Sequence, residues 1–221
     1  LLKIVKPTIM TAVPRLLEKI FNKIKSSISQ KPLISKIIAS LAFKYALHHD
    51  LDKNSFLFKI YDKIVYSKLR DIFGSRLERL ISGGAPLSKE IAQFFVNIGV
   101  PVYQGYGLTE FSPVISTNYP NANKVGSCGK VIPSAQIKIN ENKELLVRGP
   151  SLMAGYLNQD DLTHKTIDKE GWLHTGDNAI LDEDGYLYIT SRAKEIFKTS
   201  TGEYVNAVSI EQKLSKNRYI E

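Results

Sequence analysis

The stretch from residue 76 to residue 103 most constrains what this 221-residue chain can fold into. Residues 76–81 (RLERLI) predict a short strand, and the turn sequence SGGAP follows at 82–86. Ser88 can cap a helix over 88–98, and residues 100–103 (VPVY) predict a second strand. This order is a βαβ unit, so the sequence predicts an α/β fold with a parallel sheet. Ligands of such sheets bind beyond the carboxyl ends of the strands.

Helical periodicity dominates the first third of the chain, with predicted helices over residues 15–28, 33–48 and 55–73. Pro14 suits a first helical turn, and Pro32 separates the first two helices. Apolar residues form one stripe of each helix, and lysines occupy the other faces. We interpret these as core-packing helices with solvated outer faces. Docking on an anionic membrane or on nucleic acid is the alternative.

The composition is that of an ordinary globular protein, with 43% hydrophobic and 24% charged residues, which excludes disordered and collagen-like classes. The net charge of +8 fits an anionic partner, but it equally fits a piece whose acidic counterpart lies elsewhere. The single cysteine, Cys128, permits no internal disulfide and favours a cytoplasmic setting. We expect neither a signal peptide nor a transmembrane helix, and we keep open a peripheral contact with the inner face of the membrane.

Short strands are predicted after residue 120, over 135–139, 144–148, 179–181 and 186–189. The acidic run from Asp182 to Gly185 lacks the ligand spacing of an EF-hand. Asp-Gly between two strand patterns is typical of a hairpin turn, so we predict a turn and no calcium loop. A last helix is predicted over 208–215.

Three clusters of glycine and polar residues could carry chemistry. The first includes Gly83, Gly84 and Ala85 after the predicted strand. Its glycines would let a flat ligand or an acyl chain approach the backbone closely. A tight strand-to-helix turn would use the same residues, and both interpretations stay open.

The second cluster runs from Gln104 to Glu110 (QGYGLTE). Tyr106, between Gly105 and Gly107, could stack on a base. Thr109 can donate to a phosphate oxygen, and Glu110 can hold a Mg²⁺ ion that carries the phosphate. A loop needs neither this Thr-Glu pair nor a tyrosine between glycines, so we favour a functional role.

The third cluster is residues 171–177 (GWLHTGD), followed by Arg192. The carboxylate of Asp177 could accept both hydroxyls of a ribose, and Arg192 could donate to the same sugar or to a phosphate. Trp172 and His174 are interpreted as packing residues.

Together these residues resemble the adenylate-forming superfamily, which includes acyl-CoA synthetases, luciferases and peptide-synthetase adenylation domains. The similarity covers almost the whole chain, because its adenine and Mg²⁺ motif, its ribose motif and its hinge sequence occur in the same order and spacing. Residues 6–8 and 13–20 resemble long-chain fatty acyl-CoA synthetases in particular, as does the helical insertion before Ser82.

The resemblance implies a domain plan. Residues 1–190 would be the C-terminal portion of the large AMP-binding domain, and 191–221 the hinge and the start of the small C-terminal domain. The large portion would divide into a helical insertion (1–75), a βαβ nucleotide site (76–120) and a β-rich subdomain (121–190).

The resemblance also implies a reaction and its residues. A fatty carboxylate would attack the α-phosphate of ATP, and the thiol of coenzyme A would then attack the acyl-adenylate. The implied roles are adenine stacking for Tyr106, α-phosphate binding for Thr109, Mg²⁺ binding for Glu110, ribose binding for Asp177 and Arg192, and lining of the adenine and acyl site for Gly83, Gly84 and Ala85. Gln104, Gly105 and Gly107 belong to the same nucleotide-binding run.

The hinge segment completes the implied site. Lys194 takes the hinge position, where family members often have Asp. Lys198 and Gly202 would lie in the loop that faces the active site in the thioester-forming state. The family's Ser/Thr/Gly-rich phosphate loop ending in Pro-Lys does not occur in this sequence, and none of its lysines can be assigned the C-terminal catalytic role. We therefore expect a piece of a longer enzyme.

Two alternatives remain at this point. The protein could be an adenylating ligase for a medium-chain, aryl or amino acid. It could instead be a basic module for anionic membrane or nucleic acid with a degenerate ligase fold, although that gives no reason for Thr109, Glu110, Asp177 and Arg192 all to be intact. With the ligase interpretation, no nucleic-acid partner is expected.

Overall fold

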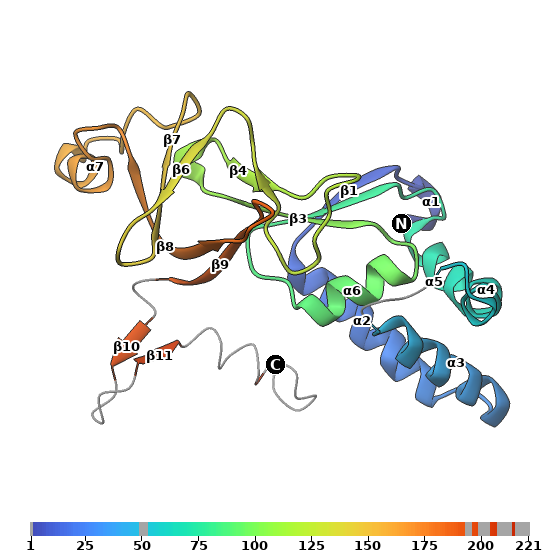
Figure 1. The fold of residues 1–221 in the computed structure, drawn as a ribbon. Helices are drawn as coiled ribbons and strands as arrows, with labels where there is room; N and C mark the ends of the chain where they lie inside the picture. The colour runs from blue at the N-terminus through green and yellow to red at the C-terminus, as the bar shows by residue number, and fades with distance from the viewer. Residues whose placement is uncertain (1, 49–52, 193–195, 199–203, 207–213, 215–221) are drawn as a thin grey trace. The chain divides into compact units, whose positions relative to one another are not determined.

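The structure is a computed structural model, and it describes residues 2–48, 53–192, 196–198, 204–206 and 214 (Figure 1). The chain divides into two compact units, residues 1–104 and 105–221. The division falls within strand β3 (Val102–Gly107), so the predicted nucleotide-site segment 76–120 contributes to both units. Each unit is described by itself.

Three parallel strands form the sheet of the first unit. β1 (Ile9–Ala12) pairs with β2 (Arg79–Ser82), and β2 pairs with β3, with Leu80 opposite Val102 and Ser82 opposite Gln104. Helix α6 (Lys89–Asn97) connects β2 to β3, which confirms the predicted βαβ unit. β1 was not predicted from the sequence, because its four residues are exposed or half-buried and lack a strong apolar pattern.

The helices of the first unit occupy the predicted segments with one correction. α2 (Pro14–Ser29) and α3 (Leu33–Ala46) match the first two predicted helices. The third is not one regular helix: it comprises α4 (Phe56–Tyr61), a π-helical turn (Asp62–Tyr66), α5 (Ser67–Arg70) and a 3₁₀ turn (Asp71–Phe73). A further short helix, α1 (Leu2–Val5), precedes β1.

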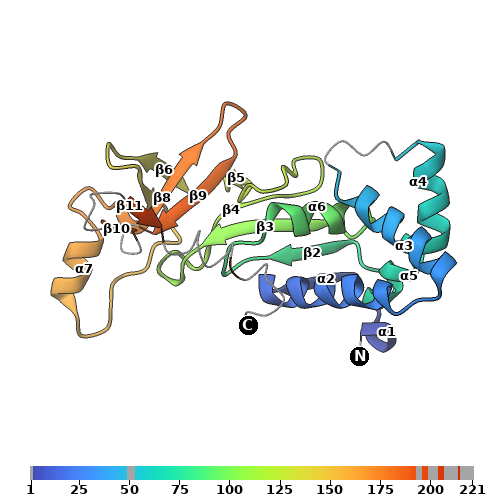
Figure 2. The ribbon, with the colours of Figure 1, turned by 90° about the horizontal axis from the view of Figure 1, so that it is seen from below.

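An aromatic cluster joins the long helices of the first unit. The ring centroid of Phe94 on α6 lies 5.1 Å from that of Phe21 on α2 and 4.8 Å from that of Phe43 on α3. Phe94 is fully buried, and α2 and α6 lie on the same side of the parallel strands (Figure 2). These contacts confirm that the first two predicted helices bury one face in a core. Within the described residues, no helix is long and apolar enough to span a membrane.

The second unit is built mainly from antiparallel strands. The end of β3 pairs with β4 (Val114–Thr117), which pairs with β5 (Lys130–Val131). A separate four-stranded sheet has the order β6 (Gln136–Ile139), β7 (Glu144–Arg148), β8 (Leu173–Leu181), β9 (Leu187–Arg192). α7 (Asp160–Thr166) lies between β7 and β8 in the chain, and β10 (Ile196–Lys198) pairs with β11 (Tyr204–Asn206). Only residue 214 of the helix predicted over 208–215 is among the described residues.

The acidic run between β8 and β9 is a turn, as predicted. The amide of Gly185 donates to the carbonyl of Asp182 over 2.9 Å, and Gly185 has a φ of +80°. The Lys124 ammonium lies 2.7 Å from carboxylate oxygens of both Asp182 and Asp184. Its hydrogen bond holds the pKa of Asp182 down to about 2. The Lys124 ammonium therefore neutralises the two carboxylates that a calcium ion would otherwise have to bind. Within the described residues there is no cluster of metal ligands.

Candidate nucleotide site

The nucleotide motif begins inside strand β3, where the sequence analysis had expected a loop. Gly105 and Tyr106 pair with Thr117 and Ser116 of β4, and Gly107 pairs with Val114. Within this strand, Tyr106 packs against both buried clusters of the second unit. The chain leaves β3 at Gly107 and enters a 3₁₀ turn (Thr109–Phe111).

The 3₁₀ turn is anchored by its last residue. Phe111 is fully buried in a cluster with Ile115, Val147 and Leu173. This burial fixes the turn against β4, β7 and β8 while leaving Thr109 exposed and Glu110 half-buried. The two polar side chains of the motif are therefore displayed from a rigid support, with the Thr109 hydroxyl at the surface.

Asp177 is held between two of the predicted nucleotide-binding residues. The Tyr106 hydroxyl donates to its Oδ2 over 2.6 Å, and the Arg192 Nε donates to its Oδ1 over 3.2 Å. Asp177 lies opposite Arg192 in the β8–β9 ladder, and its amide donates to the Thr175 hydroxyl. The structure thus brings together three residues that are up to 86 positions apart in the sequence.

Burial and charge shape this triad. Asp177 is only 3% exposed, so an unpaired carboxylate there would be costly. Burial, and then the hydrogen bond to Asp177, raise the pKa of the Tyr106 phenol well above its usual range. Tyr106 therefore stays a protonated donor at neutral pH. The Arg192 side chain remains 62% exposed and can donate to a further oxygen while it pairs with Asp177.

Residues 173–177 of the third cluster belong to strand β8. β8 starts at Leu173, and Leu146 and Val147 of β7 pair with His174 and Leu173. The Trp172 ring lies under two cations, with Lys138 Nζ 4.5 Å and Arg148 Cζ 4.6 Å from its centroid. His174 Nδ1 lies 3.1 Å from a Glu144 carboxylate oxygen. Both side chains have structural partners, although half-exposed His174 pairs with a carboxylate and is not part of a buried cluster.

Glu110 has a partner that the sequence analysis missed. The Tyr156 hydroxyl donates to Glu110 Oε1 over 2.8 Å, and the Met153 amide donates to the Glu110 carbonyl, also over 2.8 Å. Both donors come from the segment between β7 and α7. The only signal in the sequence was an aromatic residue after a glycine, which is too common to single out Tyr156.

The remaining predicted residues fall elsewhere. Gly83, Gly84 and Ala85 follow β2 in the first unit, and Gln104 pairs with Ser82 there. Lys194 and Gly202 lie outside the described residues. The backbone of Lys198 belongs to β10, opposite Tyr204, and its side chain is not described.

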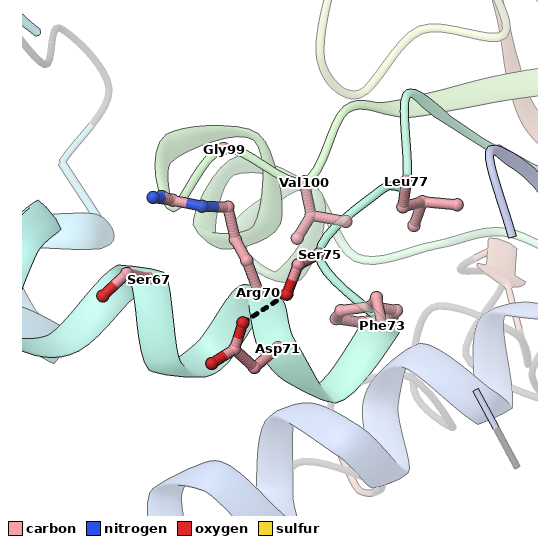
Figure 3. Close-up of a pocket in the computed structure, with 8 residues that line it drawn as sticks. All are labelled: Ser67, Arg70, Asp71, Phe73, Ser75, Leu77, Gly99 and Val100. Carbon is pink, nitrogen blue, oxygen red and sulfur yellow. Dashed lines mark hydrogen bonds between the residues drawn. The ribbon is translucent and has the colours of Figure 1, made fainter. Parts of the chain in front are cut away.

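A pocket in the first unit contains none of the predicted site residues. It has a volume of about 260 Å³ and is lined by Ser67, Arg70, Asp71, Phe73, Ser75, Leu77, Gly99 and Val100 (Figure 3). Arg70 spans its edge by donating to the Ile98 carbonyl over 2.8 Å and to Asp62 Oδ2 over 3.2 Å. Asp71 and Ser75 are hydrogen-bonded to each other. Because the polar groups of this pocket are paired with each other, we interpret it as a packing contact between residues 62–77 and the C-terminal end of α6.

The sequence of residues 1–157 matches the AMP-binding enzyme family. The chain belongs to this family. It is 36% identical over 222 residues to the long-chain-fatty-acid–CoA ligase ACSBG2 of Xenopus laevis, covering 95% of this chain and 30% of the frog protein. It is 34% identical over 220 residues to the long-chain-fatty-acid–CoA ligase FadD15 of Mycobacterium bovis, covering 97% of this chain and 36% of that protein. The chain therefore spans about a third of the length of these relatives.

Solved structures of family members share the fold. The o-succinylbenzoate coenzyme A synthetase of Bacillus subtilis in complex with AMP aligns with a TM-score of 0.64 at 22% identity, over 96% of this chain and 36% of that one. The anthranilate CoA ligase AuaEII in complex with anthranoyl-AMP aligns with a TM-score of 0.64 at 21% identity, over 98% and 36% of the two chains. The α/β fold expected of an adenylate-forming enzyme is confirmed.

Proposed function

We propose that the protein containing this chain activates a long-chain fatty acid with ATP, forming acyl-AMP and pyrophosphate, and then transfers the acyl group to the thiol of coenzyme A. The observation that carries the proposal is the Asp177 carboxylate held between Tyr106 and Arg192, with Thr109 and Glu110 displayed just beyond Tyr106. The identities of 36% and 34% to two long-chain-fatty-acid–CoA ligases support the choice of acid.

The triad fits the sugar of a nucleotide. A carboxylate with two fixed oxygens can accept hydrogen bonds from the two hydroxyls of a ribose, and Tyr106 and Arg192 hold those oxygens in one orientation. Arg192, being mostly exposed, can donate to the ligand at the same time. Tyr106 would also present its ring to adenine. Gly83, Gly84, Ala85 and Gln104 are proposed to line an adenine and acyl site.

The Thr109–Glu110 pair fits a metal-bound phosphate. The exposed Thr109 hydroxyl makes no hydrogen bond within the described residues and can donate to an α-phosphate oxygen. Mg²⁺ is usually held by one or two carboxylates together with waters and phosphate oxygens, and a single Glu110 carboxylate meets that requirement. The ion would neutralise charge that builds up on the phosphate. Lys194, Lys198 and Gly202 are proposed to act at the hinge and in the thioester-forming state.

The test is acid-dependent exchange of pyrophosphate into ATP by the full-length protein. We expect exchange with a long-chain fatty acid, and thioester formation when coenzyme A is added. A panel with a medium-chain acid, an aryl acid and an amino acid separates the proposal from a ligase for another acid. Equal or faster exchange with one of those acids would overturn the long-chain assignment, and no exchange with any acid would overturn the adenylating function.

The isolated 221-residue chain should not support this exchange. It contains Thr109, Glu110, Asp177 and Arg192 but no sequence that matches the family's phosphate loop. Without that loop, the β- and γ-phosphates lack backbone donors and the rate enhancement that such donors supply. The chain should be assayed beside the full-length protein at equal molar concentration. Measurable fatty-acid-dependent exchange by the 221 residues alone would contradict the expectation.

A further inference from the structure

One short segment holds both the main chain and the side chain of Glu110. The Met153 amide donates to the Glu110 carbonyl, and three residues later the Tyr156 hydroxyl donates to Glu110 Oε1. Phe111 anchors the neighbouring backbone in the core, but it leaves the three side-chain torsions of Glu110 free. A glutamate side chain loses rotamer entropy when a ligand immobilises it, so a free side chain would lose part of its binding energy.

Tyr156 is itself fixed in place. Its amide donates to the Thr163 hydroxyl over 2.9 Å, and that hydroxyl donates to the Gln159 carbonyl over 3.0 Å at the start of α7. Gly155 packs against the same threonine, because a Cβ at Gly155 would lie 3.0 Å from Thr163 atoms. The tyrosine therefore starts from a backbone tied to α7, and its own side chain has only two torsions.

The bond is made to one carboxylate oxygen only. Tyr156 occupies Oε1, and within the described residues no hydrogen bond is made to Oε2. The phenol of Tyr156 is the donor in this bond, because a carboxylate oxygen accepts. With the donor on Oε1, Oε2 remains available to a cation.

We propose that Tyr156 is a positioning residue for Glu110, aiming Oε2 at the metal ion that carries the nucleotide phosphates. The inference rests on the proposed role of Glu110. It adds that the two carboxylate oxygens have different roles: Oε1 accepts from Tyr156, a residue outside the nucleotide motif, and Oε2 faces the metal ion.

The test compares Tyr156→Phe with Tyr188→Phe in the full-length protein. Tyr188 is a matched control, because its hydroxyl donates to Asp182 Oδ2 over 3.1 Å in the β8–β9 turn. The direct measurement is binding of Mn²⁺·ATP by electron paramagnetic resonance, followed by the Mg²⁺ dependence of exchange. We expect Tyr156→Phe to weaken metal–nucleotide binding about ten-fold, with an unchanged KM for the fatty acid. Tyr188→Phe should change neither.

A double-mutant cycle separates positioning from a general loss of structure. If Tyr156 acts through Glu110, Tyr156→Phe should have no further effect on Mn²⁺·ATP binding in a Glu110→Gln background. Equal binding by the wild type and Tyr156→Phe, or equal weakening in both backgrounds, would overturn the proposal. Metal binding that depends on both residues, without any acid-dependent exchange, would support the positioning role and refute only the proposed function.

The excess of positive charge near the start of the chain supports a second inference. Residues 1–48 contain nine lysines and arginines against one acidic residue, a net charge of +8. The totals of 30 basic and 22 acidic residues leave 21 of each for the rest of the chain. The whole net charge of the sequence is therefore accounted for by residues 1–48, and within the described residues none of these basic side chains forms an ion pair.

Helix α3 presents apolar residues on the face opposite its core. Ala39, Ala42, Phe43 and Ala46 are buried, whereas Leu33 and Ile34 are each 74% exposed, and Ile37 and Leu41 are each 51% exposed. The exposed four lie within about a third of the helical circle at 3.6 residues per turn. Lys36 and Lys44 are exposed on the same helix. An apolar strip with flanking cations is the pattern of a helix that lies in a lipid interface.

We infer that this face of α3, defined by Leu33, Ile34, Ile37 and Leu41, docks on an anionic lipid surface. The lysines match the headgroup charge, and the aliphatic side chains match the acyl boundary. Nucleic acid would be held by the lysines but would give the apolar strip no contact. The inference does not depend on the proposed reaction.

Co-sedimentation of the full-length protein with vesicles tests this surface. Vesicles of phosphatidylcholine with 30% phosphatidylglycerol should bind the protein, and neutral phosphatidylcholine vesicles should bind it at least several-fold less, because they lack the headgroup charge that attracts the lysines. The double variant Ile34→Glu, Ile37→Glu should lose most of the binding. Ile180→Glu, at a residue 51% exposed in β8, is the matched control and should bind as the wild type does. No binding to anionic vesicles at low salt, or full binding by the double variant, would overturn the inference.

Discussion

Replacing Glu110 by glutamine in the full-length protein should slow adenylate formation by about 10²–10³-fold, while the fold is retained. The substitution keeps the size of the side chain and removes its charge. Glu110 is half-buried, and its carbonyl bond to Met153 and the burial of Phe111 do not involve the carboxylate. What is lost is the negative charge that would hold a metal ion at the phosphates.

The measurement is fatty-acid-dependent exchange at several Mg²⁺ concentrations. We expect a lower maximal rate and a higher Mg²⁺ concentration for half-maximal rate. Glu183→Gln is the control, because Glu183 is exposed in the β8–β9 turn and the substitution makes the same change in charge. A Glu110→Gln protein with the rate and Mg²⁺ dependence of the wild type would remove Glu110 from the proposed site.

The parts of the fold that the sequence predicted are those set by local periodicity. α2, α3 and α6 follow from apolar residues at helical spacing, and the βαβ unit follows from the strand-turn-helix-strand order of residues 76–103. β1 was missed because a four-residue strand with exposed side chains has no local signature. It exists because β2 offers it a parallel partner, which is a property of the assembled sheet.

In the candidate site, too, local sequence predicted some features, and others depend on the assembled sheet. The residue types of the motifs identified Tyr106, Glu110, Asp177 and Arg192, but not how they are connected. Tyr106 and Asp177 are 71 positions apart, and Tyr156 and Glu110 are 46 apart. Such pairs depend on which strands neighbour each other, and no local pattern encodes that. Strand pairing also explains why residues 105–107, part of a motif expected in a loop, lie in β3.

A side chain at Gly107 should strongly destabilise the fold, because packing within the chain leaves no room for one there. A Cβ at this position would lie 1.8 Å from the Pro113 carbonyl oxygen and 2.7 Å from its carbon. The same carbonyl accepts the Leu108 amide over 2.8 Å, which closes the loop that contains the 3₁₀ turn with Thr109 and Glu110. The glycine that the motif seemed to reserve for a ligand is therefore required by β3 and β4 themselves.

Gly107→Ala should accordingly destabilise the second unit by about 3–5 kcal/mol, since backbone on β4 would have to move. Gly105→Ala is the matched control in the same strand. Its Cβ would lie 3.1 Å from the Ser116 carbonyl oxygen, a contact that a small shift relieves at a cost of about 1 kcal/mol. Hydrogen exchange of peptides from β3 and β4 in the full-length protein measures this local stability. If Gly107→Ala kept wild-type protection and lost only activity, the glycine would serve the ligand and the packing argument would be wrong.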